Sequence, residues 1–173
     1  LCHQIASTFD HVDTSARNWT ERIILHTHDT QGKFHLSNGF GLYRNRNTID
    51  AFACLNLDGT TQYTVRASRE LLPPPDEVAV GPFSYEIIEP LKKVRYSLAE
   101  TDYDLSYDLE FDGVMPCQEE DRTFFRVRGR IEEEAVRYNQ AGRASGWIKV
   151  ARKKYDVDKS SFYVERDHSW GLR

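Results

Sequence analysis

Hydrophobic and polar residues alternate through much of this 173-residue chain with a period of two, which is the repeat of a β-strand. The alternation is clearest over residues 103–111, where aromatic and aliphatic side chains alternate with Asp, Ser and Glu. A second strong signal is the pair of segments 49–57 and 60–68, which are joined by Asp58-Gly59. This dipeptide supplies the positive φ that a tight hairpin turn needs, so the pair is predicted to form a β-hairpin.

Several shorter segments follow the same pattern and are separated by turn residues such as Gln31-Gly32 and Gly81-Pro82. We expect further strands at 21–28, 39–44, 83–89, 94–99, 123–131, 146–150 and 162–166. One segment, 131–140, tolerates a helix because three Glu and one Ala follow one another there. The sequence therefore predicts an all-β fold, an antiparallel barrel or sandwich with at most one short helix.

Composition supports one globular domain over residues 1–173. Hydrophobic residues make up 39% of the chain and aromatic residues 12%, whereas Met occurs only once, which favours pleated surfaces over helix bundles. The chain length suits a single core. Pro73-Pro74-Pro75 forms an exposed connection, but composition does not change across it, so it marks no domain boundary.

Charge and cysteine content exclude several functional classes. The net charge is −4 with both signs interleaved, so no basic surface for nucleic acid is expected. Apolar stretches are too short to span a membrane, and the start of the chain has no secretory apolar core. We expect a cytoplasmic protein, with a leader removed before residue 1 as the alternative. Cys2, Cys54 and Cys117 are expected to be reduced thiols, because their number is odd and their spacing wide.

The last eight residues, 166–173, gather the most chemistry in the chain. If the preceding strand continues, Asp167 and Ser169 face one side while His168 and Trp170 face the other. A Trp face can stabilise a developing cation, and a His can donate, accept or relay a proton near neutral pH. The second pair is thus a candidate catalytic site.

A purely structural interpretation of the same segment also stays open. In it, Asp167 pairs with Arg166 or Arg173, and Trp170 fills one end of the barrel.

The sequence Arg-Asp-His-Ser-Trp-Gly-x-Arg, after a glycine-rich approach through Gly142 and Gly146, resembles the signature of the carotenoid 1,2-hydratase and AttH-like lipocalin superfamily. Upstream segments are similar as well. They are Trp19-Thr20-Glu21, Gly39-Phe40-Gly41 and Val80-Gly81-Pro82-Phe83. The resemblance spans most of the chain, although only the terminal motif is specific.

This resemblance implies a lipocalin-like β-domain, the N-terminal half of a two-domain protein with a long cavity for an apolar isoprenoid, polyketide or lipid. The expected partners are that ligand and a second lipocalin-like domain or another copy of the chain. Asp167, His168 and Trp170 become the catalytic candidates of a hydratase, cyclase or isomerase acting on a carbon-carbon double bond. In the hydratase branch the His-x-Trp pair works with an acid from sequence past the motif, beyond Arg173 here. A non-catalytic lipid-binding or interaction domain is the alternative.

Other residues are candidates to line a cavity or to bind a metal. Tyr85, Glu86 and Tyr96, together with Trp170, are expected ligand-binding residues, although the sequence does not decide which way Glu86 faces. His26 and His28 share one strand face with His35 nearby, but no carboxylate or Cys has ligand spacing, so no metal is predicted. Neither a phosphate loop nor a nucleophile elbow is present, and no cofactor is expected.

Overall fold

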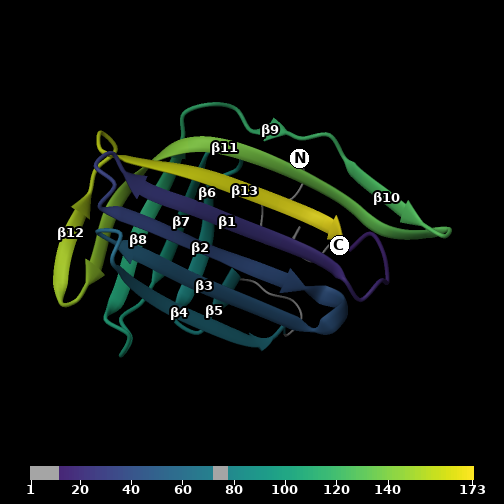
Figure 1. Cartoon of the computed structure of the whole chain (residues 1–173), viewed down its shortest axis with the longest axis horizontal. Helices are drawn as coiled ribbons and strands as arrows, with labels where there is room; N and C mark the ends of the chain where they lie inside the picture. The colour runs from purple at the N-terminus through teal and green to yellow at the C-terminus, as the bar shows by residue number, and fades with distance from the viewer. Residues whose placement is uncertain (1–11, 72–77) are drawn as a thin grey trace.

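The computed structural model describes residues 12–71 and 78–173, so Cys2 and Pro73-Pro74-Pro75 lie outside the described residues. Thirteen antiparallel strands form one sheet that curls into a nearly closed barrel (Figure 1). Within the described part the one helical segment is the short 3₁₀ turn η2 (Arg44–Arg46). The predicted all-β class is confirmed.

The strands follow one another along the chain with short connections. They are β1 (Trp19–Asp29), β2 (Phe34–Tyr43), β3 (Thr48–Leu57), β4 (Thr61–Glu70), β5 (Val78–Val80), β6 (Phe83–Glu89), β7 (Lys93–Leu98), β8 (Leu105–Gly113), β9 (Gln118–Glu119), β10 (Thr123–Val127), β11 (Arg130–Val150), β12 (Lys153–Val157) and β13 (Phe162–Leu172). The predicted hairpin is confirmed, because Asp58 and Gly59 join β3 to β4 with φ of 54° and 66°.

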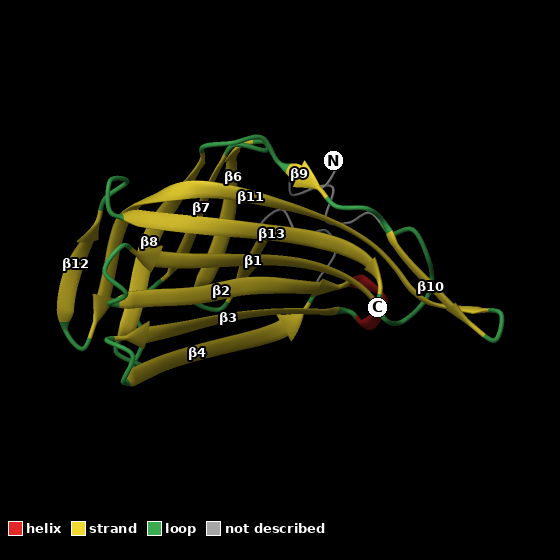
Figure 2. Ribbon diagram, turned by 45° about the horizontal axis from the view of Figure 1, so that its top comes forward, coloured by secondary structure: helices red, strands yellow, loops and turns green. Residues whose placement is uncertain are grey.

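The order of strands in the sheet is β4-β3-β2-β1-β13-β11-β8-β7-β6-β5. The sheet bends so strongly that β6–β8 cross behind β1–β3 (Figure 2). The edge strands β4 and β5 are joined by a side chain: Arg69 donates from Nε and Nη2 to the Ala79 carbonyl oxygen at 3.0 and 2.8 Å. This double hydrogen bond links the open edges and hides part of the unpaired backbone.

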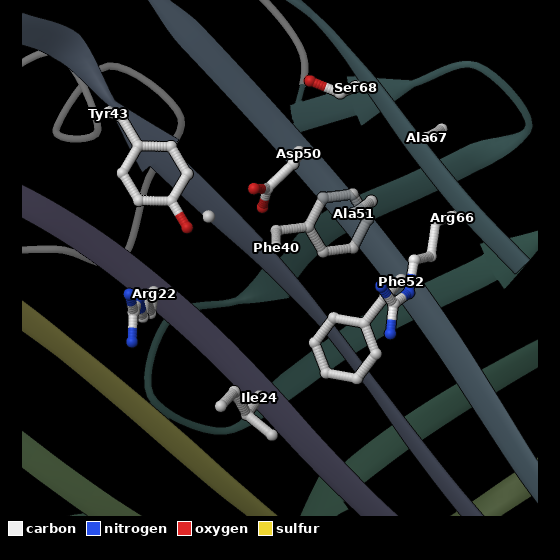
Figure 3. A pocket seen from close by; sticks show the side chains of 11 residues that line it. Arg22, Ile24, Phe40, Tyr43, Asp50, Ala51, Phe52, Arg66, Ala67 and Ser68 are labelled. Atoms are coloured by element: carbon white, nitrogen blue, oxygen red, sulfur yellow. The ribbon is translucent and has the colours of Figure 1, made fainter. Parts of the chain in front are cut away.

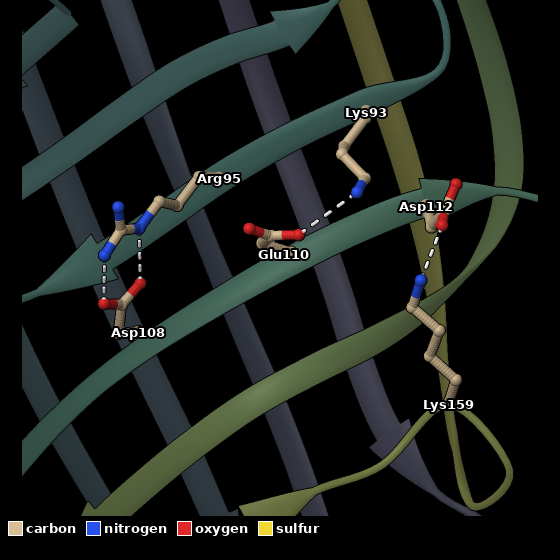
Figure 4. Close-up of polar contacts among 6 residues, drawn as sticks. All are labelled: Lys93, Arg95, Asp108, Glu110, Asp112 and Lys159. Atoms are coloured by element: carbon tan, nitrogen blue, oxygen red, sulfur yellow. Dashed lines mark hydrogen bonds and ion pairs between the residues drawn. The ribbon is translucent and has the colours of Figure 1, made fainter.

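Side chains on the inner face form one core of aliphatic and aromatic residues. Ile23 and Leu25 of β1, Leu36 of β2 and Leu109 of β8 are among its fully buried members. The outer face is polar and carries ion pairs across neighbouring elements (Figure 4). These pairs are Arg95 with Asp108, Lys93 with Glu110, and Lys159 with Asp112. The alternation in the sequence is thus the alternation of a core face with a wet face.

The helix predicted over 131–140 is wrong, because these residues lie in the 21-residue strand β11. Their backbone pairs with β10 and β9 on one side and with β13 on the other. The strand predicted over 123–131 is instead broken by a turn at Arg128 and Gly129, where φ is 48° and 81°. Pairing to distant strands therefore outweighs the weak local preference of the Glu-rich segment for helix.

The hairpin of β10 and the first residues of β11 extends beyond the barrel (Figure 1). We call it the arm, residues 123–135. Its strand β10 exposes Phe124, Phe125 and Val127 by 54%, 58% and 39%. Apolar side chains this exposed on a projecting hairpin are typical of a surface that contacts a partner.

Candidate functional site

The terminal motif lies on β13 and divides its side chains between the two faces of the sheet. Arg166, His168 and Trp170 point to the inner face and are 0%, 0% and 6% exposed. Asp167 lies on the other face, as alternation along the strand requires. The predicted pairing of His168 and Trp170 on one wall matches this arrangement.

His168 is the middle member of a hydrogen-bonded chain of three buried side chains. Its Nε2 lies 2.7 Å from Oε1 of Glu21, and its Nδ1 lies 2.8 Å from the hydroxyl of Tyr138. Glu21 and Tyr138 are both fully buried. In the tautomer with its proton on Nε2, His168 donates to Glu21 and accepts from Tyr138. The three groups can thus move a proton along one line.

Sheet register brings these residues together from three strands. His168 on β13 lies opposite Ile23 of β1 on one side and Tyr138 of β11 on the other. Glu21 shares the inner face of β1 with Ile23, two residues along the strand, and pairs with Trp170. Three adjacent strands therefore hold the acid, the imidazole and the phenol rigidly in place.

Aromatic rings enclose this polar chain. The Trp170 indole lies 5.6 Å from the His168 ring with an interplanar angle of 76°, and 6.2 Å from the Tyr138 ring. Trp19 joins Tyr138 and Trp170 in a cluster apart from the main core. A carboxyl group thus lies in an aromatic environment whose ring faces can interact with a cation.

Arg166 forms a second polar group beside the first. Its guanidinium is buried, donates to Oε1 of Gln140 at 2.9 Å and lies 3.5 Å from Sγ of Cys117. It also lies 5.3 Å from the ring centres of Phe111 and Tyr138. A buried charge of this kind is retained only when several groups stabilise it, and here amide, thiol and two rings do so.

The predicted cavity residues divide between the two faces. Tyr85 and Tyr96 are buried on the inner face. Burial raises the pKa of Tyr85, and the neighbouring Arg166 opposes that rise, which places Tyr85 near the polar interior. Glu86 is exposed on the outer face, away from Tyr85 and Tyr96, and its role in ligand binding stays a prediction. Because neighbouring residues of a strand face opposite sides, only one of Tyr85 and Glu86 can point inward. The aromatic Tyr85 packs in the apolar core, so the charged Glu86 faces solvent.

Asp167 lies on the face opposite His168 and Trp170, as strand alternation predicts, and its catalytic role stays a prediction. On the outer face, its carboxylate forms an ion pair with the Arg137 guanidinium, and Nε lies 3.0 Å from the carboxylate oxygen. Burial raises the pKa of Asp167, and the charges of Arg137 and Arg173 oppose that rise. The predicted pairing of Asp167 with Arg166 is wrong, because successive residues of a strand point to opposite faces.

The histidines considered for a metal lie on the outer surface of the barrel. The rings of His26 and His35 stack with centres 5.8 Å apart, and Nδ1 of His26 lies 2.9 Å from Oγ of Ser37. His28 instead stacks on Tyr163. Across residues 12–71 and 78–173 no group of three potential ligands is placed to bind a metal ion.

Sequence reasoning missed Glu21 and Tyr138 as site residues and did not place Arg166 inside. The signal for Glu21 was present, because this carboxylate is in phase with Ile23 and Leu25 on an alternating strand. A charged residue that alternates in phase with buried apolar residues of the same strand is expected to point into the core. A buried carboxyl thus lies near the start of the chain, on β1.

Two solved structures resemble this fold. An AttH-like protein from Nitrosomonas europaea matches with a TM-score of 0.66 and 12% identity, over 90% of this chain and 51% of that one. Kievitone hydratase from Nectria haematococca matches with a TM-score of 0.60 and 10% identity, over 98% of this chain and 55% of that one. This chain therefore spans about half the length of each, and the likeness shows a lipocalin-like fold.

Comparison with curated proteins finds no match. Within the described residues, no helix is long and apolar enough to cross a membrane. Residues 2–173 match the model of a family of unknown function, DUF8625, and the chain belongs to that family.

Proposed function

We propose that this chain is a lipocalin-like domain that binds an elongated apolar molecule, an isoprenoid, polyketide or lipid, and acts on one of its carbon-carbon double bonds. The observation that carries the proposal is the fully buried Glu21 carboxyl, bonded to His168 at 2.7 Å beside the Trp170 indole. Proton donors placed in apolar, water-poor surroundings suit alkene protonation. The reaction class is hydration, or a cyclisation or isomerisation that begins in the same way.

In the hydration, Glu21 in its acid form transfers its proton to one alkene carbon. The π electrons form the new C–H bond and leave a cation on the neighbouring carbon. The face of Trp170 stabilises that cation, and a water oxygen then bonds to it. The proton that the added water loses returns to the Glu21 carboxylate, so the acid is restored and the sum is alkene plus water giving alcohol.

His168 acts in this proposal as a positioning residue. Its imidazole holds one Glu21 oxygen and is held in turn by the Tyr138 hydroxyl at 2.8 Å. The carboxyl group is thereby fixed in one rotamer instead of sampling several, which lowers the entropic cost of reaching the transition state. Kievitone hydratase, a protein of similar structure, adds support for a hydratase-type reaction only through its shared fold.

The alternative is a non-catalytic lipid-binding or interaction domain. The observation that favours it is the complete burial of both Glu21 and His168, since buried ion pairs also occur as devices that fix one packing arrangement. Under this alternative Trp170 and Tyr138 serve only to pack the barrel end.

Water addition by the full-length gene product tests the proposal. Isoprenoid, polyketide and unsaturated-lipid alkenes are incubated in ¹⁸O-water, and mass spectrometry measures incorporation into alcohol products. We expect Glu21→Gln to lose at least a hundredfold in rate, within the usual contribution of a general acid, with its melting temperature close to wild type. Glu86→Gln, on the outer face, is the matched control and should keep the rate. No labelled alcohol from any alkene, or full activity in Glu21→Gln, would favour the non-catalytic alternative.

We also propose that the arm contacts a second lipocalin-like domain or another copy of the chain. Support comes from the exposed Phe124, Phe125 and Val127, since a hairpin that extends from the barrel cannot bury them within its own domain. A cytoplasmic location is proposed as well, supported by the free thiols of Cys54 and Cys117.

A further inference from the structure

A hollow of about 660 Å³ lies on the outer face of β1–β4, on the side of the sheet opposite Glu21 and His168 (Figure 3). Two adjacent rows of cross-strand neighbours form it. The first row runs across the four strands as Arg22, Gly41, Asp50 and Ser68. The second row runs as Ile24, Gly39, Phe52 and Arg66.

Two glycines of β2, Gly39 and Gly41, lie beneath the hollow, and both are buried under the side chains around them. A Cβ on Gly39 would lie 2.6 Å from the Ile23 carbonyl oxygen, so packing of the strands explains that glycine. A Cβ on Gly41 would lie 2.5 Å from the Tyr43 hydroxyl and 2.6 Å from a carboxylate oxygen of Asp50, so these two side chains already fill the space above that glycine. Gly41 thus leaves room for Tyr43 and Asp50 at one end of the hollow, and Ile24, Phe52 and Arg66 lie at the other end (Figure 3).

The charges around the hollow are unequally matched. Burial raises the pKa of Asp50, and the hydrogen bond with Tyr43 and the charge of Arg22 oppose that rise. Arg22 therefore has a carboxylate beside it. Arg66 is exposed, and no carboxylate in the described ranges 12–71 and 78–173 lies within ion-pair distance of it. Its guanidinium lies beside Phe52, at the apolar end of the hollow (Figure 3).

We propose that this hollow is a second binding site, for an amphipathic carboxylate. Arg66 pairs with the carboxylate through its planar fork of donors, which matches that group in geometry. Ile24 and Phe52 cover the apolar body. The hollow spans the width from β1 to β4, about 14 Å at ordinary strand spacing, so a medium-length acyl chain fits across it. The site is independent of the function proposed for the interior.

Titration calorimetry with dodecanoate, below its micelle concentration, tests the site on the full chain. We expect one dodecanoate per chain and binding at least tenfold weaker for dodecanol, which lacks the charge. Arg66→Gln should weaken dodecanoate binding about tenfold to a hundredfold, the range for a hydrogen bond to a charged group. Gly41→Val should weaken it as well, because the added side chain pushes Tyr43 and Asp50 into the hollow. Arg126→Gln, an exposed arginine on β10, is the matched control and should bind as wild type.

Three outcomes would overturn the proposal. Equal binding of dodecanol and dodecanoate would show that no carboxylate is recognised. Binding that Trp170→Phe weakens and Arg66→Gln leaves unchanged would place dodecanoate in the interior. Sedimentation of wild type as a dimer, with Gly41→Val as a monomer, would show that a second copy covers the hollow. Retained binding in Trp170→Phe, with loss in Arg66→Gln, supports the outer site whatever the interior does.

Discussion

Removing one member of the Glu21–His168 pair should destabilise the fold far more than removing both. The two side chains are 0% and 1% exposed, so Glu21→Leu takes the buried carboxyl away from the imidazole, and His168→Leu takes the buried imidazole away from the carboxyl. Breaking a buried pair in this way costs about 3–5 kcal/mol. For a domain of this size that lowers the melting temperature by about 6–20 °C. Replacing both groups with leucine removes the desolvation cost of each. The free energy of unfolding of the double variant should therefore fall by several kcal/mol less than the sum of the two single losses.

Urea unfolding at pH 7, followed by circular dichroism, gives the four free energies of this double-mutant cycle. The matched cycle uses Arg95 and Asp108, whose side chains are 49% and 28% exposed on the outer face. Their coupling should stay within about 1 kcal/mol, because solvent screens exposed pairs. Additive losses for Glu21→Leu and His168→Leu, within about 0.5 kcal/mol, would refute the idea that the two groups are coupled in the interior.

Three further predictions follow from single contacts. Arg69→Met removes both hydrogen bonds to Ala79, so hydrogen exchange of β5 amides should speed up; unchanged exchange would mean that another contact closes this edge. Burial, with the charges of His26 and His28, lowers the pKa of His35, so stability present above about pH 6.5 should be lost as pH falls through the folded-state pKa. Melts of His35→Gln should show a weaker loss, and an identical pH profile would contradict this. Serine at both Phe124 and Phe125 should reduce dye binding and self-association in sedimentation without changing the melt, whereas unchanged association would place the contact elsewhere.

The strands were predictable because their signal is local. Alternation over residues 103–111 records one wet and one buried face, and Asp58-Gly59 has the backbone freedom that its turn uses. The segment 131–140 failed for the opposite reason. Its Glu residues carry weak local preferences, while β11 is held extended by strands distant in sequence.

The site was only half predictable for the same physical reason. Strand alternation is enough to put His168 and Trp170 on one face. Their partner Glu21 lies 147 residues from His168 in sequence, and only the pairing of β1 with β13 brings it near. Alternation also separates Tyr85 from Glu86 without saying which one is inside, because that depends on what the sheet packs against.

The most direct test of the central proposal, an interior that holds an apolar molecule against Trp170, is native mass spectrometry of protein purified from its source. We predict a retained apolar ligand at one per chain that survives in the variant Trp147→Ala and is lost in Trp170→Ala. Trp147 is the matched control because it lies on the outer face of β11, stacked with Lys154. Ligand-free protein, or equal retention by the two variants, would contradict the proposal.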